Sequence, residues 1–151
     1  MIVKPLADMK RLPTKRFLFY IFPALLYAGS IFFLSSLSGV PEFYPDIFGL
    51  DWTLHFLEYY VLGYLLMRLF VTSHRRLFFV HPALLTAFFG VAYGVSDEFH
   101  QAFVPGRDPS AADVFFDTQG IFLTSTTYRR VRFGMTPLRK LEDIMERVWT
   151  Y

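Results

Sequence analysis

The sequence predicts an all-α membrane protein: a four-transmembrane-helix bundle with a re-entrant or turn segment between helices 3 and 4 and a C-terminal amphipathic helix. Three observations lead to this fold class. Of the 151 residues, 54% are hydrophobic and only 19% are charged, against about 25% charged in a soluble domain. Several apolar runs approach the ~20 residues that a helix needs to cross a bilayer. The lysines and arginines gather beside alternate ends of these runs, as the positive-inside rule requires.

The composition also excludes other classes of protein. The chain is too apolar for intrinsic disorder, and with 0 cysteines it has no disulfide scaffold and no thiolate metal ligand. The net charge of +2 gives no reason to expect a nucleic-acid partner. We therefore expect three parts: a basic cytoplasmic arm over residues 1–16, a membrane domain over 17–128, and a basic amphipathic cytoplasmic tail over 129–151.

The first two predicted spans cover residues 17–37 and 53–71. The first contains no charge and would be about 32 Å long as a helix, with a kink expected at Pro23. The second carries His55, Glu58 and Arg68. Arg68 lies near the end of the span, from which its long side chain can reach the membrane surface. This does not explain why His55 and Glu58 occur within the span.

The third and fourth predicted spans cover residues 77–96 and 111–128. The fourth is short and carries Asp113 and Asp117, and we predict it because the basic run that follows needs an anchor. In the tail, apolar residues recur at helical spacing. This amphipathic helix either lies on the membrane surface or packs against the bundle.

The distribution of basic residues predicts the topology. Lysines and arginines are concentrated in residues 1–16, in the tail, and in the connection between the second and third spans, which contains Arg75 and Arg76. The other two connections contain several acids and only one basic residue, Arg107. We therefore expect a multi-pass protein of the bacterial cytoplasmic membrane with both termini in the cytoplasm.

Polar residues gather near the predicted outer ends of three helices. Residues three or four apart share a helix face, which groups the polar residues of each span. Glu98 falls about 100° away from its neighbours, so we expect it to face the loop or the headgroups. The expected catalytic residues are Asp97, His100 and Asp113. The expected ligand-binding residues are His55, Glu58, Tyr59, Glu98, Gln101, Arg107 and Asp117.

Two local motifs support this grouping. Arg107 lies in a Pro-Gly turn, where its planar fork is suited to a phosphate. Ser110 and Asp113 have the spacing of a capping box at the start of a helix. The polar residues therefore either join the helices through a hydrogen-bond network or line a water- or ligand-filled cavity. We favour the cavity, because burying several acids with few cations is costly.

Metal ligation is a third interpretation of the polar residues. Histidine and carboxylate suit zinc or manganese, and His55 and His100 are the histidines near the acids. Neither an H-x-x-x-H nor an H-E-x-x-H spacing occurs. We therefore predict no metal site, and the sequence leaves the cofactor unknown.

Two stretches resemble the VanZ-like family of small bacterial membrane proteins. They are DWTLHFLEYYVLG at residues 51–63 and YGVSDEFHQAFVPGRDPSAADVFFDTQG at residues 93–120. Trp52 stands where the family usually has a lysine, and Asp117 where it has Asn or Asp. The resemblance implies a place in the cell envelope and, through the member that names the family, a link to tolerance of the glycopeptide teicoplanin. It implies no established reaction.

Three functions remain open from the sequence. In the first, the outer polar residues recognise or process a membrane lipid or a lipid-linked envelope precursor, with the acids and histidines doing acid–base work. In the second, the protein is a non-enzymatic accessory or antibiotic-shielding protein, and the polar residues are structural. In the third it is a small transporter, against which the absence of an inverted repeat argues. Neither the ligand nor the oligomeric state follows from the sequence.

Overall fold

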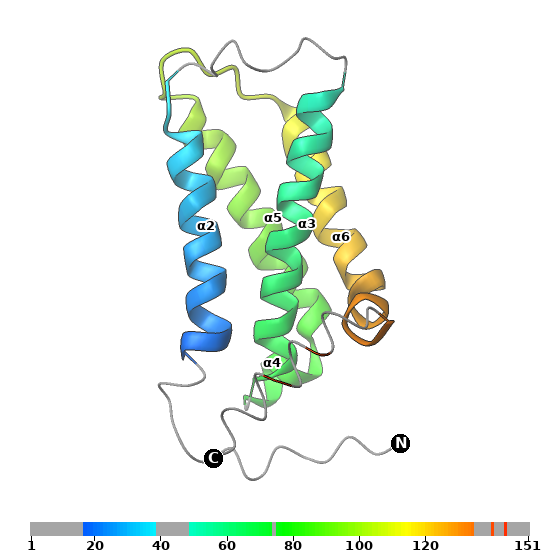
Figure 1. Cartoon of the computed structure of the whole chain (residues 1–151). Coiled ribbons are helices and arrows are strands. Elements are labelled where there is room, and N and C mark those ends of the chain that lie inside the picture. The colour runs from blue at the N-terminus through cyan, green and yellow to red at the C-terminus, as the bar shows by residue number, and fades with distance from the viewer. Residues whose placement is uncertain (1–16, 39–48, 74, 135–139, 141–143, 145–151) are drawn as a thin grey trace.

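The computed structural model of the chain describes residues 17–38, 49–73, 75–134, 140 and 144 (Figure 1). Within these residues the structure is helical, and no strand occurs. The N-terminal arm and most of the predicted amphipathic tail lie outside the described residues. In chain order the elements are η1 (Phe17–Ile21), α2 (Phe22–Ser35), α3 (Leu50–Val71), α4 (Arg76–Val80), α5 (Pro82–Gln101) and α6 (Ala111–Gly134).

The first helical segment changes from a π-helix to an α-helix next to Pro23, where the sequence predicted a kink. η1 is a π-helical turn, and α2 begins one residue before Pro23. Proline has no N–H, so it cannot bond the carbonyl four residues earlier, which belongs to Phe19. Arg68 Nη1 donates to this carbonyl oxygen at 2.8 Å instead, and its guanidinium lies 4.7 Å from the ring centre of Tyr20. The arginine that was expected to reach the membrane surface thus binds the start of the first helical segment.

The third predicted span is not one helix. It divides into α4 and α5 at His81, whose φ of −122° and ψ of 47° are not helical. The proline ring at position 82 disfavours the α conformation at the residue before it, which accounts for the break. The predicted fourth span also differs, because α6 continues past residue 128 to Gly134.

Four long helices run side by side, with α3 packed mainly on α6 (Figure 1). α5 contacts both α3 and α6, whereas α2 contacts α3 and α5 but not α6. The helices alternate in direction, so α2 and α5 end where α3 and α6 begin (Figure 1). We call this end of the bundle, which includes Ser35, Leu50, Gln101 and Ala111, the polar end. Between α5 and α6 the chain makes a turn with Gly106 at φ 83°, and no helix is inserted there.

The backbones of α3 and α6 approach closely at Gly120. A Cβ atom at this position would lie 2.8 Å from the backbone nitrogen of Tyr60 and nearer still to the carbonyl oxygen of Phe56. Gly63 and Gly90 face Ile121, which is fully buried. Thr124 Oγ1, one turn further along α6, donates to the carbonyl oxygen of Tyr60 at 2.9 Å. Small residues of this kind allow helix backbones to approach closely in membrane proteins.

The outside of the bundle is apolar, while its interior holds polar groups. Among the most exposed large side chains are Leu25, Phe33, Leu84, Phe88 and Phe103. Exposed apolar surface on this scale is typical of contact with a membrane or another protein. Two of the described segments, Phe17–Ser35 and Leu50–Val71, are long and apolar enough to cross a membrane.

Gly120→Ala should lower the free energy of unfolding by about 1–3 kcal/mol, because the new methyl group meets backbone that cannot rotate away. Gly29→Ala is the matched control, since nothing lies within 4 Å of a Cβ there. Thermal unfolding in detergent measures both. Equal unfolding temperatures for the two variants would show that α3 and α6 accommodate a methyl group at position 120 without loss of stability.

Candidate functional site

Buried polar side chains concentrate at the polar end. Each of them is at most 7% exposed, and together they come from α2, α5 and α6. They are Ser35, Asp97, Glu98, Gln101, Asp113 and Asp117. The structure separates them and their neighbours into two groups, one against α2 and one around His55 of α3.

The α2-side cluster consists of Ser35, Ser36, Asp97, His100 and Gln101. Asp97 Oδ2 accepts hydrogen bonds from Ser35 Oγ at 2.7 Å and from Gln101 Nε2 at 3.1 Å. His100 Nε2 lies 3.0 Å from Ser36 Oγ, and the imidazole stacks on Phe32 with ring centres 4.4 Å apart. These contacts connect the end of α5 to the end of α2.

Arg107 extends this connection. Its Nε donates to the carbonyl oxygen of Leu37 at 3.2 Å, and its Nη2 donates to that of Leu34. Carbonyl groups in the last turn of a helix lack partners within the helix, so the guanidinium caps the end of α2. The arginine that was expected to hold a phosphate thus has a structural contact, which uses two of its five N–H groups.

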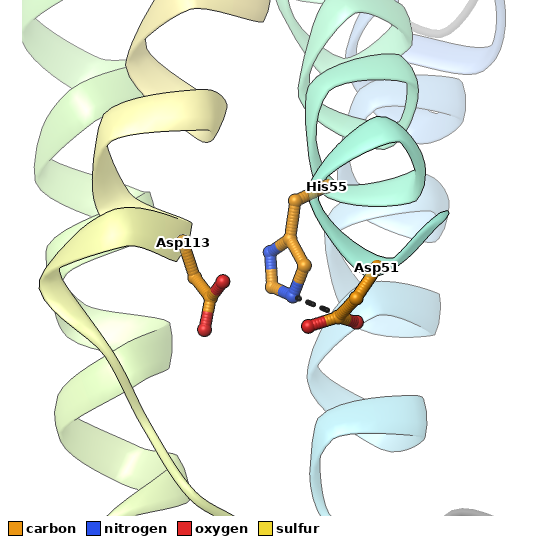
Figure 2. Close-up of side chains that lie close together, drawn as sticks. All are labelled: Asp51, His55 and Asp113. Atoms are coloured by element: carbon orange, nitrogen blue, oxygen red, sulfur yellow. Dashed lines mark ion pairs between the residues drawn. The ribbon is translucent and has the colours of Figure 1, made fainter. Parts of the chain in front are cut away.

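The His55 cluster consists of Asp51, His55, Glu98, Asp113 and Asp117. His55 Nδ1 lies 3.0 Å from Asp117 Oδ1, and His55 Nε2 lies 3.9 Å from Asp51 Oδ1. Figure 2 shows the carboxyl group of Asp113 facing the imidazole from the other side. Asp117 is 1% exposed, whereas the Asp51 side chain is 77% exposed. The cluster therefore runs from the interior of the bundle to its surface.

The start of α6 explains how Asp113 is oriented. The backbone N–H of Asp113 donates to Ser110 Oγ at 3.2 Å, and Ser110 Oγ donates to Asp113 Oδ2 at 2.8 Å. The predicted cap is thus present, but in an altered form. In a capping box the acid binds the backbone N–H of the capping residue; here Glu98 Oε2 accepts that N–H at 3.1 Å.

Glu98 corrects one expectation. Its side chain was expected to face the loop or the headgroups, yet it is only 6% exposed. Glu98 Oε1 accepts from Gln101 Nε2 at 3.3 Å, and this amide also binds Asp97. The turn after α5 folds Ser110 back over Glu98, and helical spacing alone could not reveal this contact. Glu98 and Gln101 therefore link the two clusters.

Several buried oxygen atoms at the polar end accept no hydrogen bond from the described part of the chain. They are Asp97 Oδ1, Asp113 Oδ1 and Asp117 Oδ2, together with the hydroxyl of Tyr59. Burying a polar atom without a partner costs about 1–3 kcal/mol. Such a number of unused acceptors in one place is a feature of a site that binds water, an ion or a ligand.

The remaining predicted residues lie beside the His55 cluster. Tyr59 is fully buried, and Glu58 is half-buried with its backbone oxygen bound by the Tyr27 hydroxyl at 3.3 Å. Asp97 and His100 were grouped with Asp113 in the sequence analysis, but their hydrogen bonds join them to α2 rather than to His55.

Sequence reasoning missed two serines and one aspartate. Ser35 and Ser36 form a polar pair at the end of an otherwise apolar helix, and this pattern was the available signal. Asp51 comes one turn before His55 on α3, so their spacing already placed them on one face.

The arrangement supports two kinds of chemistry. A carboxylate that holds one nitrogen of an imidazole leaves the other nitrogen free as a base or a ligand. The unused carboxylate oxygens accept hydrogen bonds from hydroxyl, amide or ammonium groups, or bind a cation.

Fold and site together define an all-helical protein in which an apolar bundle carries a histidine- and carboxylate-lined end. The VanZ/LLP1 family model matches residues 18–132, so the chain belongs to this family, as the resemblance of residues 51–120 predicted. Membership suggests a membrane protein linked to glycopeptide resistance. Neither a curated protein nor a solved structure matched the chain.

Ser110→Ala should lower the free energy of unfolding by about 1 kcal/mol, the usual cost of removing a helix cap. Ser96→Ala is the control, because the exposed Ser96 hydroxyl donates to the Tyr93 carbonyl oxygen within its own helix. Chemical or thermal unfolding in detergent measures the difference. If Ser110→Ala unfolds like Ser96→Ala, the cap does not stabilise α6.

Proposed function

We propose that the polar end faces the outside of the cytoplasmic membrane and recognises the headgroup of a lipid or lipid-linked envelope precursor. The observation that carries this proposal is the set of buried carboxylate oxygens at the polar end that have no partner among the described residues. Two of them, on Asp113 and Asp117, belong to the same cluster as the exposed Asp51. They offer acceptors to the hydroxyl, amide or ammonium groups of a headgroup. Arg107 at the same end offers the N–H groups that its contacts with α2 leave over.

An apolar cavity below the polar end supports an amphiphilic ligand. Its volume is about 380 Å³, within the range of small-molecule sites. The side chains that line it come from η1, α2, α3, α4 and α5, and all of them except Tyr93 are wholly apolar. Leu62 and Tyr93 line the cavity and lie one helical turn from Tyr59 and Asp97. An acyl or prenyl chain in this cavity would keep its headgroup close to the clusters.

The sidedness rests on the sequence. In the proposed topology α2, α3, α5 and α6 cross the membrane, both termini are cytoplasmic, and the polar end is extracytoplasmic. A lipid-linked envelope precursor exposes its headgroup on that side when it is used.

One observation favours a non-enzymatic accessory or shielding protein as the second candidate. The α2-side cluster and Arg107 attach α5 and the following turn to α2 through hydrogen bonds within the chain, as structural residues do. In that case the clusters stabilise the bundle, and the link to glycopeptide resistance depends on the presence of the protein rather than on a ligand.

Binding of a lipid-linked headgroup should raise the unfolding temperature of the detergent-purified protein when polyprenyl phosphate or phosphatidylglycerol is added. Asp113→Asn should remove most of this shift, because it takes away the charge at the unused oxygen while keeping the shape of the side chain. Its own unfolding free energy should change by ~1 kcal/mol or less. Differential scanning fluorimetry measures these changes.

Asp108→Asn is the control, since Asp108 is exposed in the turn after α5. It should respond to lipid as the wild type does. A wild-type protein that no lipid stabilises, or an Asp113→Asn variant with the full shift, would contradict headgroup recognition and favour the accessory role.

The topology is tested with single cysteines, which the native chain lacks. Ser38→Cys, at the polar end, should react with a membrane-impermeant maleimide in intact cells. Arg75→Cys, in the connection between α3 and α4, should react only after the cells are permeabilised. Both positions are exposed in the structure, so labelling reports sidedness rather than burial. Reaction of Arg75→Cys in intact cells would contradict the topology.

A further inference from the structure

Three metal-ligating side chains converge where the His55 cluster reaches the surface. Asp51 and His55 lie one turn apart on α3, and Asp113 approaches from the start of α6 (Figure 2). One potential ligand atom from each residue lies within 4.8 Å of the other two. The sequence analysis predicted no metal site, because the chain lacks a paired-histidine motif and only the fold brings these three residues together.

Asp113 has an oxygen that its surroundings leave unused. The residue is only 6% exposed, and its Oδ2 accepts from Ser110, whereas its Oδ1 has no partner among the described residues. The carboxyl group faces the imidazole of His55 (Figure 2). A buried carboxylate oxygen turned towards an imidazole and a second carboxylate is suited to a cation.

Asp117 lies where it can orient His55 as a metal ligand. A carboxylate at 3.0 Å from Nδ1 is placed to accept the proton of that nitrogen, so in a neutral imidazole with this bond the lone pair is on Nε2, on the side of Asp51. Metal-binding histidines almost always donate their other N–H to a carboxylate or carbonyl in this way. The contact with Asp117 therefore orients the imidazole of His55 so that Nε2 faces a possible cation.

A second group of three, His55, Glu98 and Asp117, has comparable spacing. Both oxygens of Glu98 already accept hydrogen bonds, from Gln101 and from the backbone of Ser110. Asp117 Oδ1 is occupied by His55 Nδ1. Asp117 Oδ2 has no partner among the described residues, but neither oxygen of Glu98 is free of a hydrogen bond. The group with Asp51 and Asp113 is therefore the better candidate.

We propose that Asp51, His55 Nε2 and Asp113 bind one divalent cation of the zinc or manganese type, and that Asp117 is the positioning residue for His55. One nitrogen and two carboxylate ligands suit both ions. Ligand atoms lie about 2.0–2.2 Å from zinc, so the three atoms must approach one another on binding. The exposed Asp51 side chain has room to rotate inwards. The coordination positions of the cation that face solvent remain available to water or to an oxygen atom of a ligand.

The cation also removes a conflict within the proposed function. A phosphate would be repelled by the carboxylates of the His55 cluster. A cation bound to these carboxylates would also attract the phosphate. The attraction of a phosphate to the cation rests on the proposed headgroup recognition. Cation binding itself does not depend on that proposal.

The test is titration of the full-length protein, purified in detergent without a histidine tag and stripped with EDTA, with ZnCl₂ and MnCl₂ by isothermal titration calorimetry. We expect one ion per chain. Asp51→Asn, His55→Ala and Asp113→Asn should each weaken binding more than tenfold. Asp117→Asn should weaken it 10- to 100-fold while retaining a single site, as changes behind a metal ligand do.

The controls are His81→Ala and Asp108→Asn, which remove an exposed histidine and an exposed aspartate that are not among the three ligands. Both should bind as the wild type does. Because Asp51 is exposed, Asp51→Asn tests the site without disturbing the packing. The visible spectrum of added Co²⁺ provides a second readout, which should change when His55 is replaced.

A wild-type protein that binds no ion, or Asp51→Asn and Asp113→Asn variants that bind as tightly as the controls, would overturn the site. Repeating the lipid-shift measurement with EDTA separates the two proposals. Loss of the polyprenyl phosphate shift in EDTA supports a cation between protein and phosphate. A shift that survives EDTA, in a protein that also fails to bind zinc or manganese, overturns the cation site and leaves headgroup recognition standing.

Discussion

The close approach of α3 and α6 at Gly120 sets the distance between the helices that carry His55 and Asp117. No side chain separates the two backbones at this point, so residues one turn nearer the polar end meet directly. The 3.0 Å contact between His55 and Asp117 depends on this spacing, and so does the position of Asp113 opposite the imidazole. A larger residue at position 120 would push apart the helices that form the His55 cluster.

The polar end consists of the α2-side cluster and the His55 cluster. On the α2 side, hydrogen bonds from Ser35, Gln101 and Arg107 close within the chain and attach α2, which has few other neighbours. Carboxylate oxygens without a partner among the described residues lie in both parts, Asp97 Oδ1 on the α2 side and Asp113 Oδ1 and Asp117 Oδ2 around His55. Leaving them unpaired in an apolar bundle is costly, and a bound cation or headgroup would offset that cost around His55. Hydrogen bonds of Glu98 and Gln101 join the two parts.

Much of the fold followed from local patterns. An uncharged run predicted η1 with α2, and a largely apolar run that includes ionisable residues predicted α3. The capping residue Ser110 marked the start of α6. The break at His81 was not predicted, because the apolar run continues through it and the effect of Pro82 on the preceding residue was not weighed. The end of α6 was placed too early, since a basic run does not stop a helix.

The sequence by itself determined which residue types the polar end contains and on which helix faces most of them lie, because helical periodicity is local. It also determined the family, through the residues of the two matching stretches. Only the tertiary structure decided how these residues are paired. Asp97 and His100 bind α2, Glu98 turns inwards to Ser110, and Asp51 joins His55 and Asp113. These pairings depend on helix rotation and on the turn after α5, which bring together residues far apart in the chain.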